Sequence, residues 1–460
     1  MFTSVNPATG KPAASYPKLT DAEVGQCVAR ASATYADWRL SPHTERSDLL
    51  RRIADRFEAE TDRLAALATA EMGKTLKSAR AEVAKCVAGF RYYAQAGPGM
   101  LAPVRLKAAG GVAEARWHPI GPVLAVMPWN FPYWQVVRFL APTIMAGNVG
   151  LLKHASLTQG CALAIEEMVR EAGAPEGVFQ NLAIRAGGVA ALIADDRVAA
   201  VTLTGSEEAG ATVAEQAGRA LKKVVLELGG SDPFIVMPSA DLDAAAKAAV
   251  TARIQNAGQS CICGKRMIVH GQVYDAFAER FVAGMRAVKV GDPVDEANDM
   301  GPLSSVEQRD AVLEQLERFK AAGATLVGGE RLPGEGAYMT AGVLTDVPIE
   351  SEVAKEELFG PVAMLFRAAD ADEAIHIAND VPFGLGSSVW TNDEAERERF
   401  ARDIEAGMVA VNQVLASTPE APFGGVKRSG HGRELGAQGL HEFMNLKTVM
   451  LPGASGEVGD

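Results

Sequence analysis

Two residues that can act in turn on a carbonyl group stand near one another in the chain. Cys261 follows a Gly-Gln-Ser turn, and Glu227 ends an apolar run that begins at Val224. A thiolate can bond covalently to a substrate, and a carboxylate can take a proton from the water that later releases it. The pair therefore predicts covalent catalysis followed by base-assisted hydrolysis. Singly, each residue also fits a structural role, because Cys is often a small buried side chain and Glu is often a solvated strand end.

The residues after Cys261 bear on its reactivity. A free thiol has a pKa of about 8.5, so attack at neutral pH needs backbone N–H groups or cations close to the sulfur. Gly264, Lys265 and Arg266 follow within a few positions and are candidates for this effect. If the segment is extended, Cys261 and Cys263 lie on the same side. That arrangement leaves two interpretations of Cys263, a reversible redox lock or a plain packed thiol, and ring strain in so short a disulfide favours the second.

Two further segments place polar groups directly after apolar runs. Asn130, in Pro-Trp-Asn-Phe-Pro, follows the run 123–127 and is suited either to hold an oxyanion or to form a turn before a helix. Gly205 and Ser206 follow another run and open a helical stretch, where phosphate can meet free N–H groups. A simple helix N-cap explains them equally well. The chain has neither a Walker A loop nor a GxGxxG fingerprint.

Composition narrows the classes of function. With 460 residues, 48% of them hydrophobic, the chain exceeds the size of a single core and predicts two or more domains. The net charge of −12 argues against a general surface for nucleic acid or anionic membranes. We find no apolar stretch of about 18 residues and no basic-then-apolar start, which predicts a soluble, unexported protein.

The cysteines and histidines predict neither disulfides nor a metal site. Five cysteines without a CxxC spacing indicate reduced thiols in a cytoplasm. Seven histidines show no metal-ligand pattern such as HExxH.

The elements that must position these residues follow from hydrophobic periodicity. Helices are predicted over 21–38 and 44–95, the second interrupted near Gly73 and ended by Gly97-Pro98-Gly99. Apolar runs then alternate with helical periods, which predicts a parallel sheet with crossover helices. The first series of runs is 123–127, 149–153, 178–184, 198–204 and 224–228. A second series, 234–237, 266–270, 362–367, 387–390 and 408–412, predicts a second α/β domain.

Seven short motifs occur in an order that resembles the aldehyde dehydrogenase superfamily. They are Pro128-Trp-Asn-Phe-Pro, Leu152-Lys-His-Ala-Ser, Thr204-Gly-Ser, Glu227-Leu-Gly-Gly, Gly258-Gln-Ser-Cys, Glu357-Leu-Phe-Gly-Pro and Pro422-Phe-Gly-Gly. With Asn6-Pro-Ala-Thr-Gly as the opening segment, the resemblance covers nearly the whole chain. It implies an α/β fold with a Rossmann-type cofactor domain, an α/β catalytic domain and a small β oligomerisation element.

The resemblance also implies bounds for these parts. The cofactor-binding domain would be 1–100 and 119–227, and the catalytic domain 228–420. The oligomerisation element would be 101–118, where the sequence predicts an exposed hairpin, together with 440–455. This element implies a homodimer or a tetramer built from two dimers.

The mechanism that the resemblance implies uses three side chains. The Cys261 thiolate attacks an aldehyde, while the Asn130 side chain and the Cys261 backbone N–H hold the oxyanion. After hydride transfer to the nicotinamide cofactor a thioester stays on Cys261. Glu227 activates the water that hydrolyses it. No metal is required.

Further residues match the cofactor contacts of the superfamily. These are Trp129, Lys153, Ser156, Gly205, Ser206 and Leu228, with Glu357 and Phe359 at the nicotinamide ribose and ring. A solvated strand end for Lys153 and a core aromatic for Phe359 are the structural alternatives. NAD-selective relatives often carry Glu where this chain has Ser156. A neutral hydroxyl there does not repel a 2′-phosphate, so we expect NADP to be preferred over NAD.

The substrate is predicted from the helix after Asn130. Trp134 and Arg138 are four residues apart on one helix face, and relatives with apolar substrates often have an aromatic residue in place of Arg138. The arginine therefore predicts a carboxylate clamp and a dicarboxylic semialdehyde such as succinate semialdehyde, with Ser417 as a further contact. A surface arginine paired with Asp or Glu is the alternative. Longer relatives have an arginine where this chain has Gln255, so their particular carboxylate clamp is not expected here and Arg138 is left for that role.

Other functions remain open. One alternative is a broad-specificity NAD(P)-dependent aldehyde dehydrogenase. A CoA-acylating enzyme would not need Glu227. A non-catalytic binding protein on this scaffold would not need Cys261, Glu227 and Asn130 together, and a thioesterase would leave the cofactor motifs unexplained.

Overall fold

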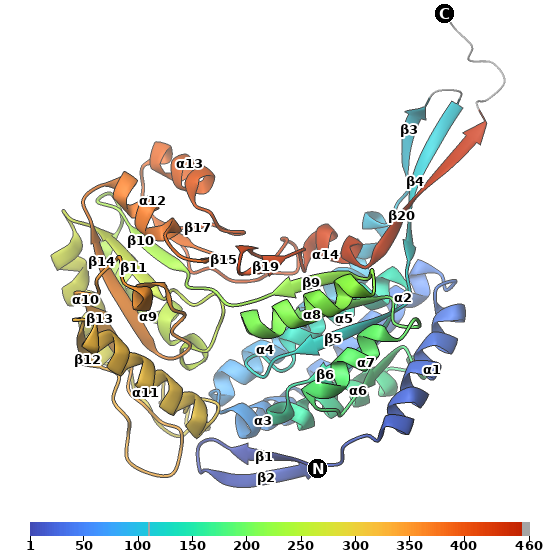
Figure 1. Ribbon diagram of the computed structural model, residues 1–460, viewed down its shortest axis with the longest axis horizontal. Helices are drawn as coiled ribbons and strands as arrows, with labels where there is room; N and C mark the ends of the chain where they lie inside the picture. The colour runs from blue at the N-terminus through green and yellow to red at the C-terminus, as the bar shows by residue number, and fades with distance from the viewer. Residues whose placement is uncertain (109–110, 453–460) are drawn as a thin grey trace, which may run out of the picture.

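Two lobes and a projecting arm make up the molecule (Figure 1). The computed structural model describes residues 1–108 and 111–452. The predicted frayed tail, residues 453–460, lies outside the described residues. The first lobe holds a six-stranded sheet, the second a seven-stranded sheet and the arm a three-stranded sheet. This arrangement confirms the predicted α/β class with a small β element.

The sheet of the first lobe has the order β19-β9-β8-β5-β6-β7. Its strands are β5 (Pro122–Met127), β6 (Val149–His154), β7 (Phe179–Asn181), β8 (Ala200–Thr204), β9 (Lys223–Glu227) and β19 (Gly430–His431). All pairs are parallel except β19 with β9. The crossover helices are α5 (Trp134–Ala146), α6 (Gln159–Glu171), α7 (Val189–Ala194) and α8 (Glu207–Arg219). The carboxyl ends of β5, β6, β8 and β9 consequently open on one edge, where ligands bind in such sheets.

The helices that precede this sheet are α1 (Asp21–Trp38), α2 (His43–Ala59), α3 (Thr61–Met72) and α4 (Leu76–Met100). The predicted end at Gly97-Pro98-Gly99 is wrong, since α4 continues to Met100. A Cβ on Gly97 would lie 2.4 Å from Met145 Cγ, so this glycine allows α4 to pack closely on α5. Pro98 lies inside the last turn of α4 and lacks an N–H, so the helix continues here without one of its backbone hydrogen bonds.

The sheet of the second lobe has the order β12-β13-β14-β11-β10-β16-β17. Its strands are β10 (Pro233–Val236), β11 (Arg266–His270), β12 (Thr325–Gly328), β13 (Gly342–Thr345), β14 (Val362–Ala368), β16 (Ser388–Trp390) and β17 (Ala410–Val411). The surrounding helices are α9 (Leu242–Ile254), α10 (Tyr274–Arg286), α11 (Val306–Ala321), α12 (Ala371–Asn379) and α13 (Glu394–Asp403). Every predicted run of the second series contributes a strand. The sequence interpretation missed β12 and β13, which are short and lie at one side of the sheet.

The arm consists of β3 (Val104–Ala108), β4 (Gly111–Pro119) and β20 (Met444–Pro452), all antiparallel. The described parts of 101–118 thus form the predicted hairpin. Its exposed large apolar side chains are Val104, Leu106, Leu446 and Met450. Smaller elements are β1 (Phe2–Asn6) with β2 (Lys11–Tyr16), β15 (Phe383–Gly384) with β18 (Val426–Lys427), and α14 (Gly436–Glu442). The domain bounds stay a prediction, and residues 453–455 of the predicted oligomerisation element lie outside the described residues.

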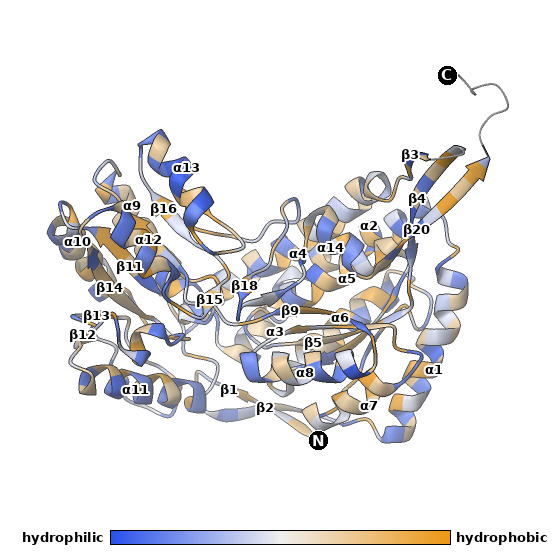
Figure 2. Ribbon diagram, turned by 45° about the horizontal axis from the view of Figure 1, so that its top comes forward, coloured by the Kyte–Doolittle hydropathy of each residue, from blue (hydrophilic) through white to orange (hydrophobic). Residues whose placement is uncertain are grey.

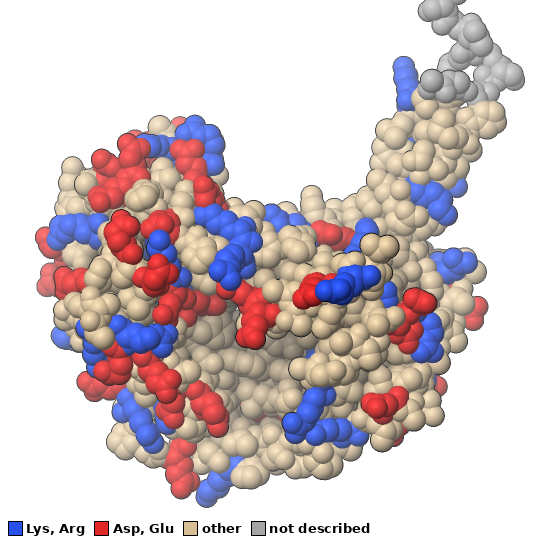
Figure 3. All heavy atoms as spheres, viewed as in Figure 1, with Lys and Arg blue, Asp and Glu red and all other residues tan. Residues whose placement is uncertain are grey.

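Apolar residues are concentrated in the strands inside the lobes, and most charged residues lie on the surface. Strands such as β5 are apolar, whereas the exposed helices α11 and α13 are largely polar (Figure 2). Acidic and basic side chains are interspersed over the face drawn in Figure 3, and that face is hollowed between the lobes.

No helix among residues 1–108 and 111–452 combines the length and apolar character needed to cross a membrane. All five cysteines are free.

Candidate active site

A pocket of about 280 Å³ lies at the carboxyl edge of the first sheet and is closed on its other side by residues of the second lobe. It brings together most of the predicted site residues, namely Cys261, Asn130, Trp129, Gly205, Ser206, Leu228, Glu357 and Phe359. The other lining residues, which the sequence interpretation did not select, are Pro128, Gln135, Thr204, Gly229 and Gln308. Segments distant in sequence therefore meet around one thiol.

A strained turn carries Cys261 into this pocket. Asn256 and Ala257 both have positive φ, 54° and 55°, and Gly258 follows with φ +74°. A Cβ on Gly258 would lie 2.2 Å from the carbonyl oxygen of Gly360, so only glycine fits there. Backbone strain of this kind persists only where the surroundings impose it. The buried Arg253 provides part of that constraint, because its guanidinium donates to the carbonyls of Gly258, Leu358 and Gly360.

Asn130 is tied to the same turn. Its Nδ2 donates to the backbone carbonyl oxygen of Gln259 at 3.1 Å, and the backbone carbonyl oxygen of Asn130 accepts from Asn256 Nδ2 at 2.8 Å. The second hydrogen of Asn130 Nδ2 has no acceptor among the described residues. The Asn130 amide, which lines the pocket beside Cys261, is therefore oriented by the protein and still has one hydrogen to donate.

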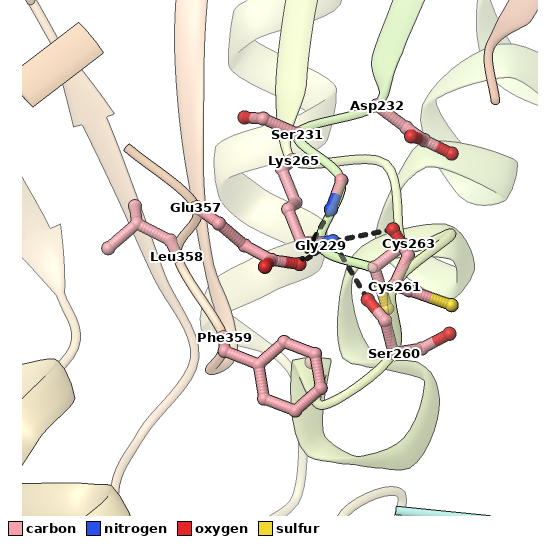
Figure 4. A network of polar contacts seen from close by, with 12 residues as sticks. Gly229, Ser231, Asp232, Ser260, Cys261, Cys263, Lys265, Glu357, Leu358 and Phe359 are labelled. Atoms are coloured by element: carbon pink, nitrogen blue, oxygen red, sulfur yellow. Dashed lines mark hydrogen bonds and ion pairs between the residues drawn. The ribbon is translucent and has the colours of Figure 1, made fainter. Parts of the chain in front are cut away.

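Lys265 fixes the backbone of the nucleophile (Figure 4). Its Nζ donates to the carbonyl oxygens of Ser260 and Cys261, each at 2.8 Å, and lies 3.0 Å from Glu357 Oε1. Glu357 Oε1 also accepts from the Gly230 backbone N–H at 3.2 Å. From the sequence, Lys265 was predicted only as one of the cations that follow Cys261. Its contacts link the cysteine turn to the segment that carries Glu357.

The surroundings of Cys261 favour the protonated thiol at neutral pH. Burial raises its pKa to about 12, although the charges of Arg138 and Lys265 act in the opposite direction. Burial is the larger effect because it removes the water that would solvate a thiolate. The thiol must therefore lose its proton during the reaction.

Glu227 occupies the last position of β9 and is not among the residues that line the pocket. It is buried, and neither carboxylate oxygen has a hydrogen-bond partner in the described part of the chain. Burial raises its pKa well above the ordinary value, and the nearby Glu434 carboxylate raises it further. A Cβ on Gly424 would lie 2.6 Å from Glu227 Oε1, so this glycine leaves room for the carboxylate. An unsolvated carboxylate without donors is a strong proton acceptor once ionised.

Arg138 has an acidic partner inside the protein. Its Nε lies 2.8 Å from Glu434 Oε2, both side chains are buried, and its guanidinium lies over the Phe423 ring at 4.4 Å from the centroid. The residue is thus paired with Glu, as the structural alternative predicted, but it is buried rather than at the surface. Arg138 is also absent from the pocket lining given above. A clamp role for it stays a prediction.

The other two predicted substrate residues contact each other. The indole Nε1 of Trp134 donates to Ser417 Oγ at 2.9 Å, and both side chains are buried. The same hydroxyl accepts from Lys85 Nζ at 2.8 Å. Lys85 belongs to α4, and the sequence interpretation missed it because nothing in the helical pattern separates an inward lysine from a solvated one.

The remaining predicted cofactor residues lie at the ends of neighbouring strands. Lys153, half-buried near the end of β6, pairs in register with Val126 of β5, which leads into Trp129. Burial lowers the Lys153 pKa. Ser156 is exposed and begins a short 3₁₀ turn, Ser156–Thr158. Trp129 and Phe359 form an edge-to-face pair with centroids 5.8 Å apart. Neither Lys153 nor Ser156 lines the pocket around Cys261.

Cys263 is fully buried, and its thiol donates to the Gln255 carbonyl at 3.5 Å. The thiol is therefore packed inside the turn. A redox role for Cys263 stays a prediction.

Comparison with known proteins identifies the family. The model of the aldehyde dehydrogenase family matches residues 1–449. A succinate-semialdehyde dehydrogenase (NADP+) 1 of Mycobacterium bovis is 52% identical over 98% of this chain and 99% of its own. A succinate-semialdehyde dehydrogenase (NADP+) of Mycolicibacterium paratuberculosis is 53% identical, over 100% and 98% of the two chains. The crystal structure of succinic semialdehyde dehydrogenase from Streptococcus pyogenes in complex with NADP+ is 37% identical, with a TM-score of 0.96 over 98% of this chain and 100% of that one. The chain therefore belongs to the aldehyde dehydrogenase family.

Proposed function

We propose that the enzyme oxidises succinate semialdehyde to succinate with NADP+ as its cofactor. The observation that carries the proposal is the pocket that Cys261 and Asn130 line together with Trp129, Ser206 and Phe359. The nucleophile and the amide donor thus line the same pocket as two aromatic rings and the first residues of helix α8. The choice of substrate and cofactor rests on the two mycobacterial relatives, whose names specify succinate semialdehyde and NADP+.

The first step is attack by the Cys261 sulfur on the aldehyde carbon, after the thiol has given its proton to water. The free hydrogen of Asn130 Nδ2 and the Cys261 backbone N–H donate to the oxygen as it gains negative charge. Lys265 holds this N–H in place through the neighbouring carbonyls. The donors are preorganised, so little of their stabilising effect is lost to rearrangement.

Release of the acyl group from Cys261 is the task of Glu227. Its carboxylate takes a proton from the water that attacks the acyl carbon. The raised pKa suits this task, because an ionised carboxylate in dry surroundings binds a proton tightly.

The residues present fit a dinucleotide at the edge of the first sheet. Ser206 caps α8, whose free N–H groups can receive a pyrophosphate, and Glu207 in the first turn is paired with Arg428 at 3.2 Å. Lys153 and Ser156 follow the adjacent strand. They would contact the adenosine ribose, where a lysine and a hydroxyl accept a 2′-phosphate. When bound, NADP+ supplies the acceptor for the aldehyde hydride.

The distal carboxylate of the substrate is assigned to the group around Ser417. Ser417 carries a hydroxyl there that Trp134 Nε1 orients, and Arg138 is the predicted clamp. A broad-specificity aldehyde dehydrogenase is the second candidate. It is favoured by the ion pair of Arg138 with Glu434, which occupies the cation that a carboxylate would need.

Assembly and location are further parts of the proposal. The exposed apolar side chains of the arm are suited to pair with a second copy, which supports a homodimer or a tetramer built from two dimers. A cytoplasmic location is proposed because the five cysteines are free.

The test is a spectrophotometric assay of NADPH and NADH formation. The substrates are succinate semialdehyde, a shorter dicarboxylic semialdehyde and butanal, which has the same chain length without the carboxylate. We expect the highest kcat/KM with succinate semialdehyde and NADP+, and no activity in Cys261→Ser. Equal kcat/KM for butanal and succinate semialdehyde would favour the broad-specificity enzyme, and no reduced cofactor with any aldehyde would favour a non-catalytic protein.

A further inference from the structure

Lys85 is an inward-pointing cation beside the predicted substrate groups. Its Nζ is 2.8 Å from Ser417 Oγ and 4.6 Å from the centre of the Trp134 ring. These two residues are among the three that the sequence assigned to the substrate, the third being Arg138. The side chain is only partly exposed, so its charge is largely withdrawn from water.

No carboxylate among residues 1–108 and 111–452 lies within 4.0 Å of Lys85 Nζ. The acidic residue nearest to it in sequence, Glu82, is engaged elsewhere: one oxygen binds Lys74, and the other accepts from the backbone N–H groups of Tyr133 and Trp134. The other charged and titratable groups that influence Lys85 are Arg138, Cys86 and Cys261. A half-buried cation without a counter-ion is costly and favours an anionic partner.

Arg138 differs in this respect. It is paired with Glu434 inside the protein, and the pair carries no net charge. Binding a substrate carboxylate at Arg138 would require breaking this pair or leaving two carboxylates on one guanidinium. At Lys85 the ammonium has three hydrogens, of which the described contacts use one.

We propose that Lys85 binds the distal carboxylate of the substrate and is the main determinant of the preference for a dicarboxylic semialdehyde. Ser417 acts with it by fixing the ammonium and by offering its hydroxyl to the same carboxylate. The proposal rests on the proposed function, since it assumes that the substrate carries a second acidic group. It also gives a reason for the Trp134 position, because the indole face stabilises the cation while the site is empty of substrate.

The packing around Cys261 supports this assignment. Cys261 packs against the same apolar core that contains Trp134, and the Lys85 ammonium lies over the Trp134 ring. A short semialdehyde bonded to Cys261 would therefore bring its carboxylate toward the ammonium. Burial, followed by the charge of Arg138, lowers the Lys85 pKa to about 8, so the cation is present at neutral pH and is lost in alkali.

The test compares Lys85→Met with wild type on succinate semialdehyde and butanal. A hydrogen-bonded charge partner contributes about 1.5–3 kcal/mol, so kcat/KM for the semialdehyde should fall about 10- to 100-fold, mainly through KM. The value for butanal should stay unchanged. Lys85→Arg should keep part of the preference, because it keeps the charge. Lys77→Met is the matched control, since this exposed lysine of the same helix should affect neither substrate.

Equal losses on both aldehydes, or no loss on the semialdehyde, would overturn the proposal. If Lys85→Met does not fold, wild type provides the second measurement. Its ratio of kcat/KM for succinate semialdehyde to that for butanal should fall as the pH rises through about 8. A constant ratio would overturn the proposal as well. A wild type without preference for the semialdehyde refutes the proposed substrate, whereas a preference that survives Lys85→Met refutes only the role of Lys85.

Discussion

The buried ion pair of Lys74 with Glu82 should be the most sensitive point in the support of the site. The two side chains are 0% and 1% exposed. Glu82 Oε1 accepts from the backbone N–H groups of Tyr133 and Trp134, at 2.8 and 2.9 Å, and so caps the start of α5. The Lys74 ammonium lies 4.1 Å from the centre of the Phe131 ring. One carboxylate thus holds the segment between Asn130 and the substrate residues of α5.

Glu82→Gln removes the charge but keeps an oxygen for the two N–H groups. It leaves Lys74 as an unpaired buried cation facing an amide. Breaking a buried ion pair from one side costs about 3–5 kcal/mol, so the free energy of unfolding should fall by about that amount. The double variant Lys74→Met with Glu82→Gln should recover most of the loss, because it removes the unpaired charge.

Denaturant unfolding of wild type, the two single variants and the double variant measures this coupling. Succinate semialdehyde kinetics on the same proteins show whether Asn130 and Trp134 are displaced. The reasoning would be refuted if Glu82→Gln lost less than about 1 kcal/mol. It would also be refuted if the double variant lost the sum of the single losses, because the two residues would then act independently.

Two further predictions concern the cofactor and the thiol. Ser156→Glu places a carboxylate where a 2′-phosphate is expected, so kcat/KM for NADP+ should fall more than that for NAD+. A parallel loss with both cofactors, or a preference for NAD+ already in wild type, would remove Ser156 from this role. Oxidation of butanal should accelerate as the pH rises above neutral, because the Cys261 thiol, with its pKa of about 12, and Glu227, with its raised pKa, both act in their deprotonated forms. A kcat/KM that decreases over this range would show that another group limits the reaction.

The sequence predicted the fold where periodicity and strand length were distinct. The runs that became β5, β6, β8 and β9 are apolar on both faces, as expected for a parallel sheet covered by helices. The predicted end of α4 was wrong because Gly and Pro disfavour a helix as a general tendency, which packing at a given position can outweigh. Close packing on Met145 outweighs that tendency here. β19 was missed because two residues carry no periodic signal.

The site was predictable where function restricts the residue type, as at Cys261, Asn130 and Phe359. Lys85 and Glu434 were missed for a physical reason, since a charged side chain in an amphipathic pattern is normally solvated. Only tertiary packing shows that Lys85 points toward Ser417 and that Glu434 is buried against Arg138. The same packing shows that Lys265, one of several cations near the nucleophile, binds the carbonyls of its turn.

The central claim is that Cys261 carries the acyl group and Glu227 activates the water that releases it. The most direct test is mass spectrometry of the variant Glu227→Gln quenched during turnover. The variant is mixed with succinate semialdehyde and NADP+, digested at low pH and mapped. General-base catalysis contributes about 100- to 10,000-fold, so hydrolysis should become slow and the succinyl group should accumulate on the peptide that contains Cys261. Wild type treated in the same way should show far less of this adduct. A variant that turns over at the wild-type rate, or an acyl group on a residue other than Cys261, would contradict the account.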